Sequence, residues 1–172
     1  MTISTPALLF LAFVIFQRLS ELWIAKRNTA KLLERGAIEH GQDHYAYMVA
    51  MHTCWIVALV IFGLSQPLNV FWLLLFIILQ GIRIWILSTL GERWTTRIIV
   101  IDEPLVLGGP FRYFRHPNYM LVIAEIIVTP MVLGLWWVAL LFTVLNSAML
   151  YVRIGTEERA LAHLRNAQPK TD

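Results

Sequence analysis

The stretch Leu68-Asn-Val-Phe-Trp-Leu-Leu-Leu-Phe-Ile-Ile-Leu-Gln-Gly-Ile-Arg-Ile-Trp-Ile-Leu-Ser-Thr-Leu90 contains one charged residue, Arg83, among mostly apolar side chains. A transmembrane helix needs roughly 20 consecutive, mostly apolar residues, and this stretch meets that length. Further apolar runs occupy Pro6–Ile24, Tyr47–Leu64, Tyr119–Leu133 and Leu135–Val152. We therefore predict an all-α integral membrane protein with about five transmembrane helices, forming a single membrane domain over residues 1–172.

The composition agrees with this fold class. Hydrophobic residues make up 58% of the chain, whereas soluble domains are about 45–50% apolar. Tyr119–Leu133 is the shortest run, and we expect it to form a tight helical hairpin with Leu135–Val152 across Gly134. The first run lacks a basic segment before it and a clear cleavage site after it, so we expect no cleaved signal peptide. Cys54 is the single cysteine, which excludes an internal disulfide.

The basic residues predict an orientation in the membrane. Lys and Arg gather after the first and third runs and in the C-terminal tail, whereas residues 1–5, 65–69 and Gly134 include none. Because short cytoplasmic segments are enriched in Lys and Arg, we expect the N-terminus outside and the C-terminus and longer loops in the cytoplasm. The net charge of +3 fits contact with anionic membrane lipids and gives no reason to expect nucleic-acid binding.

Charged residues inside the predicted spans are Arg18, Glu21, Arg83 and Glu125. Such residues usually face the bundle interior or a watery cavity and pair there. Arg18 and Glu21 are three residues apart on one helical face and can pair with each other. Two interpretations stay open. The four residues line a polar cavity that opens to the cytoplasm, or they are structural ion pairs and arginines that reach the interface.

The segment Gly109-Pro-Phe-Arg-Tyr-Phe-Arg-His-Pro-Asn-Tyr119 concentrates polar and aromatic side chains before a predicted span. Pro117 disfavours helical geometry at His116 and suits a first helical turn, so we expect a helix to begin at Pro117. A helix N-terminus offers amide donors and partial positive charge, to which Arg112 and Arg115 add guanidinium groups. The segment is therefore either a binding site for a carboxylate or phosphate or an aromatic and basic belt at the headgroups.

A second polar cluster, Arg153-Ile-Gly-Thr-Glu-Glu158, follows the last predicted span. A one-residue turn at Gly134 makes the last two spans antiparallel neighbours. We therefore expect this second cluster to lie close to residues 115–119.

Shorter elements are predicted around these two clusters. Ile98–Ile101 and Leu105–Leu107 have the composition of short strands. Thr156–Arg165 predicts a helix at the surface, with Leu161 and Leu164 on its inner face. All of these segments fall in the part of the chain expected to face the cytoplasm.

Two motifs in the C-terminal half, Leu105-Val-x-x-Gly109-Pro-Phe-x-x-x-Arg115-His-Pro-Asn-Tyr119 and Arg153-x-x-x-Glu157-Glu158, resemble those of the isoprenylcysteine carboxyl methyltransferase family. The resemblance covers roughly Gly91 to Leu164. It implies a small membrane enzyme that uses S-adenosyl-L-methionine and methylates an oxygen, either a carboxylate or an acidic hydroxyl, of a lipophilic acceptor. It also implies that the cofactor-binding half spans about residues 91–165.

The resemblance further implies roles for individual residues, of which Arg153, on the substrate side, is the catalytic one. The family often has histidine where Glu103 stands and tyrosine where Phe111 stands. Carried over by position, the cofactor-binding residues are Glu103, Pro104, Leu105, Val106, Phe111, His116, Pro117, Asn118, Tyr119 and Glu157.

The N-terminal half is similar to a bacterial branch of the family that O-methylates alkylpyrones. The matching residues are Arg18-Leu-Ser-Glu21, Gly36-Ala-x-Glu39-x-Gly41 and His44-Tyr45. This implies a bacterial inner membrane, an active site on its cytoplasmic face, and an alkylpyrone or a prenylcysteine as acceptor. The candidates for residues that contact the acceptor are Arg83, Glu125, His44 and Tyr45.

Other functions stay open on the sequence alone. One is a nicotinamide-dependent membrane reductase, and another is a small transporter or assembly subunit with Arg83 and Glu125 along its path. His40, His44 and His52 lack the spacing and partners of a metal motif, so we expect no metal. The sequence leaves the oligomeric state open.

Overall fold

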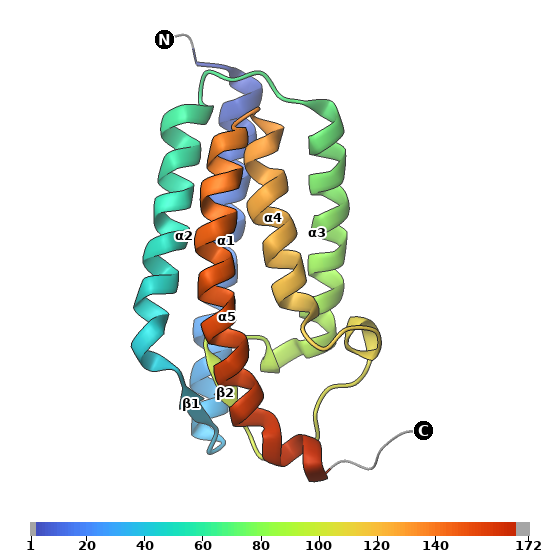
Figure 1. Ribbon diagram of the computed structural model, residues 1–172. Coiled ribbons are helices and arrows are strands. Elements are labelled where there is room, and N and C mark those ends of the chain that lie inside the picture. Colours follow the sequence, from blue (N-terminus) through green and yellow to red (C-terminus); the bar gives the residue numbers. More distant parts are fainter. Residues whose placement is uncertain (1–2, 168–172) are drawn as a thin grey trace.

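The computed structural model describes residues 3–167 and arranges its long helices side by side in an upright bundle (Figure 1). Within this range, α1, α2, α3 and α5 are long and apolar enough to cross a membrane, and α4 is a shorter apolar helix. The bounds of the helices are α1 Thr5–Glu34, α2 Gln42–Gly63, α3 Val70–Leu90, α4 Pro117–Val132 and α5 Trp136–Ala167. The prediction of an all-α integral membrane protein is confirmed.

The helix lengths suit a bilayer. At about 1.5 Å per residue, the 21 residues of α3 reach about 32 Å, close to the ~30 Å hydrocarbon core of a bilayer. The 16 residues of α4 reach only about 24 Å. Helix α5 turns back from α4 through Gly134 and continues past the start of α4 (Figure 1), as the predicted hairpin requires.

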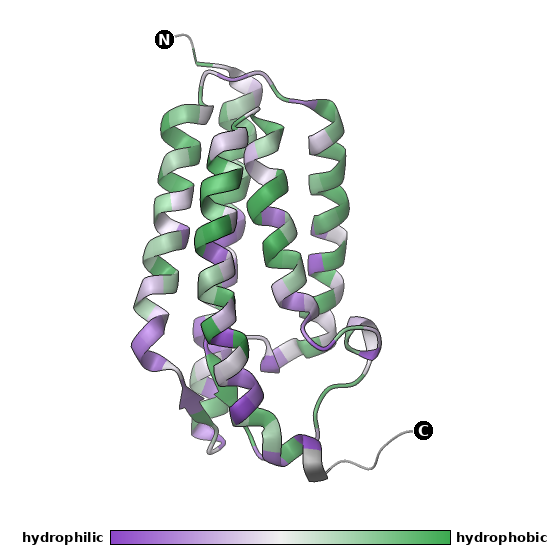
Figure 2. Ribbon diagram, in the orientation of Figure 1, coloured by the Kyte–Doolittle hydropathy of each residue, from purple (hydrophilic) through white to green (hydrophobic). Residues whose placement is uncertain are grey.

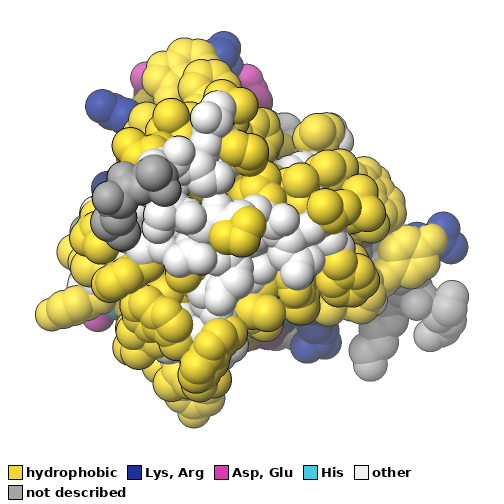
Figure 3. Space-filling model, turned by 90° about the horizontal axis from the view of Figure 1, so that it is seen from above, with side chains coloured by type: hydrophobic (Ala, Val, Ile, Leu, Met, Phe, Trp, Pro, Cys, Tyr) yellow, Lys and Arg dark blue, Asp and Glu magenta, His cyan; other side chains and the backbone are white. Residues whose placement is uncertain are grey.

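Large apolar side chains cover the outside of the bundle. Figure 2 shows hydrophobic colouring along most of the helices, with the hydrophilic residues gathered at the end away from the N-terminus. Seen from the N-terminal end, hydrophobic side chains project around the bundle, and charged ones show only at its periphery (Figure 3). Examples of exposed apolar residues are Leu9, Phe16, Ile61, Phe71 and Leu140. Lipid, not water, is the solvent in which this surface is stable.

The interior of the bundle packs where α1, α2, α4 and α5 meet. Trp55 and Leu59 of α2 contact a cluster that includes Phe10 of α1, Ile126 of α4 and Val138 of α5. Trp55, Leu59 and Val138 are fully buried. This cluster fixes the antiparallel pairing of α4 and α5, which brings the ends of both helices to the site described below.

The end of the bundle away from the N-terminus, here called the loop end, carries the short elements. Strand β1 (Ile38–His40) pairs antiparallel with β2 (Ile98–Val100), with Ile38 opposite Val100 and His40 opposite Ile98. The predicted strand at Ile98–Ile101 is thus confirmed, apart from its last residue. The predicted strand at Leu105–Leu107 is wrong, because β1 is the partner of β2 and Leu105 packs on an apolar cluster instead.

That apolar cluster ties the end of α5 to the small sheet. Leu164 is buried against Ile98 and Val100, and Leu161 packs beside it. The predicted helix at Thr156–Arg165 is confirmed, and it continues α5 without a break.

The segment before α4 is anchored on α3. Gly109 begins the short 3₁₀ helix η2 (Gly109–Arg112) with φ of +56°, a conformation that favours glycine. A Cβ atom at this position would lie 2.6 Å from Thr89 Oγ1 of α3. The glycine therefore lets η2 lie against α3, which sets where the chain enters α4.

Candidate functional site

One cavity of about 1040 Å³ extends from the loop end into the helix bundle. Ligand pockets usually measure about 300–1,000 Å³, so this volume is large for a single ligand. All five helices, β2 and the segment from Ile101 to Arg115 contribute to its walls.

Polar side chains from the start of α4 and the second half of α5 meet on one wall of this cavity. We call His116, Tyr119, Glu157 and Glu158 the loop-end cluster; the first three line the cavity, and Glu158 pairs with His116 and Arg165. The Tyr119 hydroxyl donates to Glu157, and His116 Nε2 lies 2.7 Å from Glu158 Oε1. His116 Nδ1 lies 3.5 Å from Glu157 Oε1. The expected convergence of the two polar segments is therefore confirmed.

His116 owes its position to the helix that follows it. It is the N-cap residue of α4, with φ of −131°, and Pro117 occupies the first helical turn. The hydrogen bond to Glu157 raises the pKa of His116 above its ordinary value of 6.5, with Glu158 acting in the same direction and burial opposing both. The cluster thus favours a charged imidazole between two carboxylates.

Arg153 lies beside the loop-end cluster and is buried, at 5% exposed. Its Nη2 donates to the Thr96 carbonyl at 2.9 Å, and its guanidinium carbon lies 6.0 Å from the centre of the Tyr119 ring. Within residues 3–167 it makes no ion pair with a carboxylate. A buried cation without a paired carboxylate is costly unless an anion reaches it.

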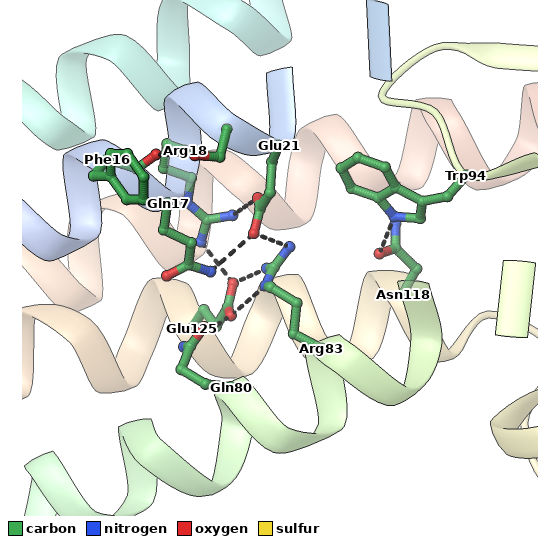
Figure 4. A network of polar contacts seen from close by, with 10 residues as sticks. Phe16, Gln17, Arg18, Glu21, Gln80, Arg83, Trp94, Asn118 and Glu125 are labelled. Atoms are coloured by element: carbon green, nitrogen blue, oxygen red, sulfur yellow. Dashed lines mark hydrogen bonds and ion pairs between the residues drawn. The ribbon is translucent and has the colours of Figure 1, made fainter. Parts of the chain in front are cut away.

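Most of the remaining residues assigned to the cofactor also line the cavity, whereas Pro104 and Pro117 do not. Glu103 is partly exposed and pairs with Arg35 and Arg93, and Arg93 also donates to the Pro104 carbonyl at 2.5 Å. Asn118 accepts from the Trp94 indole at 3.4 Å (Figure 4). The predicted residues that line the cavity are Arg83, Glu103, Leu105, Val106, Phe111, His116, Asn118, Tyr119, Arg153 and Glu157.

Four charged residues deeper in the bundle form what we call the buried ion network: Arg18, Glu21, Arg83 and Glu125. Figure 4 shows the two arginines from α1 and α3 between Glu21 of α1 and Glu125 of α4. Arg18 lies 2.9 Å from Glu21 and 2.6 Å from Glu125, and Arg83 lies 3.0 Å from Glu21. Arg83 Nε donates to Glu125 at 2.8 Å. Two arginines and two glutamates leave the network electrically neutral.

The network joins three helices. The sequence left open whether its residues line a polar cavity or form structural ion pairs, and each interpretation applies to part of the network. The predicted Arg18–Glu21 pair is confirmed. Glu125 is fully buried and does not line the cavity, whereas Arg18, Glu21 and Arg83 do.

His44 and Tyr45, the other acceptor candidates, lie at the start of α2 away from the cavity wall. His44 is buried, with Nδ1 3.4 Å from Asp43 Oδ1. Tyr45 shares a hydrogen bond of 3.1 Å with Thr96, and Arg97 stacks over its ring. Tyr45 therefore connects α2 to the segment that contains Thr96, whose carbonyl oxygen accepts the hydrogen bond from Arg153.

Sequence reasoning did not assign several polar residues to the cavity wall, among them Trp55 of α2, Asn146 of α5 and His52 of α2, which it considered only as a metal ligand. A signal for Asn146 existed, because Asn146, Arg153 and Glu157 are spaced by seven and four residues and so share one helical face. The exposed lining residues Leu19 and Leu22 of α1 and Val49 and Thr53 of α2 mark a lateral opening of the cavity toward lipid.

Comparisons with known proteins agree with these motifs. The model of the isoprenylcysteine carboxyl methyltransferase (ICMT) family matches residues 72–163. An uncharacterized protein of Bacillus subtilis, YpbQ, is 35% identical over 159 residues, which cover 89% of this chain and 95% of that protein. An uncharacterized protein of Haemophilus influenzae is 28% identical over 160 residues, covering 89% of this chain and 93% of its own length. No solved structure matches the chain.

Proposed function

The chain belongs to the isoprenylcysteine carboxyl methyltransferase family, and from this premise we propose that it uses S-adenosyl-L-methionine to methylate an oxygen of a lipophilic acceptor. Family membership supports a membrane methyltransferase in general. The cofactor, the acceptor class and the residue roles are the proposal. The observation that carries it is the meeting of the two family motifs on one wall of a large cavity.

The chain's residues fit the polar groups of that cofactor. Its carboxylate would be held by the N-terminus of α4, which has no side-chain cap, and by His116, whose pKa is raised above its ordinary value. Glu157 would hold the ammonium group, because it lines the cavity and is 26% exposed there. Leu105, Phe111 and Leu161 offer apolar wall for the adenine.

Arg153 would hold and orient the acceptor. As a buried cation without a carboxylate partner among the described residues, it suits a carboxylate or the ionised form of an acidic hydroxyl. When bound, S-adenosylmethionine would supply the methyl group: the anionic oxygen of the acceptor would bond to the methyl carbon as its bond to the positively charged sulfur breaks, and neutral-sulfur S-adenosylhomocysteine would leave. Because that oxygen is already ionised at neutral pH, the chain needs no strong base. Its contribution is to position the acceptor and exclude water.

The membrane setting fits the same proposal. The lateral opening between α1 and α2, at Leu22 and Val49, would let the acceptor's tail remain in lipid. The loop end would face the cytoplasm, where the soluble cofactor is, with the N-terminus outside. We propose that residues 1–172 work as one membrane domain whose cofactor-binding half spans about residues 91–165.

The test is cofactor binding followed by product analysis. Calorimetry on the purified chain in detergent should detect S-adenosylhomocysteine binding in the micromolar range, and NADPH should not bind. Mass spectrometry should then detect a methylated product from a panel of prenylcysteines, alkylated hydroxypyrones and lipophilic acids. Absence of S-adenosylhomocysteine binding would contradict the proposal, and NADPH binding in its place would favour a reductase.

A further inference from the structure

A second cavity, of about 490 Å³, opens on the outside of the bundle between α1 and α3 near the loop end. The proposed function does not use it. We call it the α1–α3 groove. Besides the short 3₁₀ helix η1 (Gly91–Arg93) at its end, its walls include Ile24, Arg27 and Lys31 of α1 and Ile84, Leu87 and Ser88 of α3.

Trp94 separates the groove from the large cavity. It is 4% exposed and is the single described residue that lines both. Asn28 of α1 donates to the carbonyls of Trp94 and Gly91 at 2.8 Å and 3.2 Å. On its other side, the Trp94 indole donates to Asn118 at 3.4 Å (Figure 4). These bonds hold the inner wall in place, so the groove is a preformed site distinct from the proposed cofactor and acceptor cavity.

Exposed tryptophans place the groove at the boundary between lipid and water. Trp23 and Trp85, next to lining residues on α1 and α3, are 65% and 48% exposed. Tryptophan is enriched at the headgroup level of membrane proteins. Ser88 lies in the last turn of α3, and Arg27 and Lys31 follow Trp23 by four and eight residues. Their backbones therefore lie about 6 Å and 12 Å closer to the loop end than that of Trp23.

The charges of the groove match a single phosphate diester. Arg27 is exposed, and among residues 3–167 it makes no ion pair. Lys31 pairs with Glu92. Two cations and one carboxylate leave one positive charge, which is the complement of a phosphodiester. Ser88 Oγ donates to the Trp85 carbonyl at 3.0 Å, so its oxygen can accept from a headgroup hydroxyl.

The remaining wall is apolar and faces the lipid. Ile84 is 69% exposed, and Ile24 and Leu87 are half-buried. Ile84 and Leu87 are three residues apart and so share one face of α3. An acyl chain laid along this face would bury apolar surface next to the cations.

We infer that the α1–α3 groove binds an anionic phospholipid. Its phosphate lies at Arg27, its headgroup reaches Ser88, and one acyl chain runs along Ile84 and Leu87. Basic pockets between transmembrane helices are suited to such headgroups. A free phosphate would leave the apolar wall uncovered. A zwitterionic lipid would bring an ammonium group to a groove whose carboxylate, Glu92, is already paired.

The experiment labels the groove in the full-length protein in detergent with a phosphatidylglycerol that carries a photoreactive group on one acyl chain. Trypsin cleaves after Arg83 and Arg93, so residues 84–93 are released as one peptide. Mass spectrometry measures its labelled fraction while unlabelled phosphatidylglycerol, phosphatidylcholine or glycerol phosphate competes. Phosphatidylglycerol should compete about fivefold better than phosphatidylcholine, the contribution of one Lys or Arg near a lipid surface. Glycerol phosphate should not compete.

Two variants and one control locate this preference. Arg27→Gln should abolish it, because the groove then has no net charge, and Arg27→Lys should keep it. The control is Lys26→Gln, which removes the same charge from the exposed neighbour that does not line the groove, and it should also keep the preference. Since Arg27 pairs with no carboxylate among the described residues, Arg27→Gln should unfold at the wild-type temperature in detergent without added lipid.

The contrary outcomes are specific. Equal competition by the two lipids, or no labelling of residues 84–93, would overturn the inference. An equal loss of preference in Arg27→Gln and Lys26→Gln would reveal a general attraction to basic residues and would also overturn it. Competition by glycerol phosphate as strong as that by phosphatidylglycerol would identify a phosphate site in place of a lipid site. None of these results depends on S-adenosylhomocysteine binding, so the groove and the proposed function fail separately.

Discussion

The buried ion network and the loop-end cluster each contain two glutamates beside basic side chains, but they differ in how far those glutamates are exposed. In the network, Glu21 and Glu125 each bind two arginines, and their side chains are 9% and 0% exposed. In the loop-end cluster, Glu157 and Glu158 are 26% and 33% exposed. A closed, neutral network holds helices together, whereas an open cluster on a cavity wall keeps hydrogen-bonding capacity for a ligand. Glutamates occur in both clusters, so their exposure is the difference between the two that the variants below test.

The largest expected effect is a loss of stability in Glu125→Gln, a variant of the buried ion network. Removing one carboxylate leaves Arg18 and Arg83 under-compensated inside the bundle, and breaking a buried ion pair costs about 3–5 kcal/mol. We expect the unfolding temperature in detergent to fall sharply. Arg83→Met combined with Glu125→Met should recover part of the loss, because it removes opposite charges together.

The control for this prediction is S-adenosylhomocysteine binding, measured on the same Glu125→Gln variant. If Glu125→Gln unfolded at the wild-type temperature but lost S-adenosylhomocysteine binding, the network would belong to the ligand site and the comparison would fail.

The second-largest expected effect is a loss of S-adenosylhomocysteine affinity in Glu157→Gln, a variant of the loop-end cluster. If Glu157 holds the ammonium group of the cofactor, the variant loses a hydrogen bond between charged groups, which is worth about 1.5–3 kcal/mol. S-adenosylhomocysteine affinity should then fall about 10- to 100-fold, while the unfolding temperature falls much less than in Glu125→Gln. Calorimetry and thermal unfolding on the same preparation measure both quantities. A variant with wild-type affinity and a much lower unfolding temperature would show that the open cluster is structural too.

Several of these features could be predicted from the sequence because each follows from local rules. Apolar run length predicts the helices, and Pro117 predicts the start of α4. The single-residue turn at Gly134 predicts that Glu157 returns to His116. The Arg18–Glu21 pair follows from its spacing along one helix face.

Other features depend on how separate helices cross, which no local rule supplies. The network closes because Arg83 of α3 reaches Glu21 of α1 and Glu125 of α4. Asn146 was missed because its place on the helical face of Arg153 and Glu157 gains meaning only when a cavity is seen beside that face. Strand β1 was missed because three residues between two helices are too few to form a pattern.

A smaller effect should appear in how the stability contributed by the loop-end cluster depends on pH. The folded state raises the pKa of His116 above 6.5, mainly through Glu157. The pairing therefore contributes fully below about pH 6.5 and is lost as pH rises through the raised value. We expect the gap in unfolding temperature between wild type and His116→Gln to be wider at about pH 6 than at about pH 9. A gap that stayed constant or widened toward high pH would mean that His116 is not held as a cation.

The smallest effect should come from Glu103→Gln on the loop side of the cavity. Glu103 pairs with Arg35 and Arg93 in a solvent-exposed setting, and these arginines hold its pKa below the ordinary value. Exposed ion pairs contribute little because water and salt screen them. We expect the unfolding temperature to stay near that of the wild type and S-adenosylhomocysteine affinity to change by no more than about twofold.

Glu92→Gln is the matched control for this last variant, because Glu92 makes a comparable surface pair with Lys31 and does not line the cavity. If Glu103 only shapes the surface, the two variants behave alike. If Glu103→Gln weakened binding as much as Glu157→Gln while Glu92→Gln did not, Glu103 would contact the cofactor, as the family resemblance implies. The ligand-binding region would then extend from the loop-end cluster to Glu103, and exposure alone would no longer distinguish binding carboxylates from surface ones.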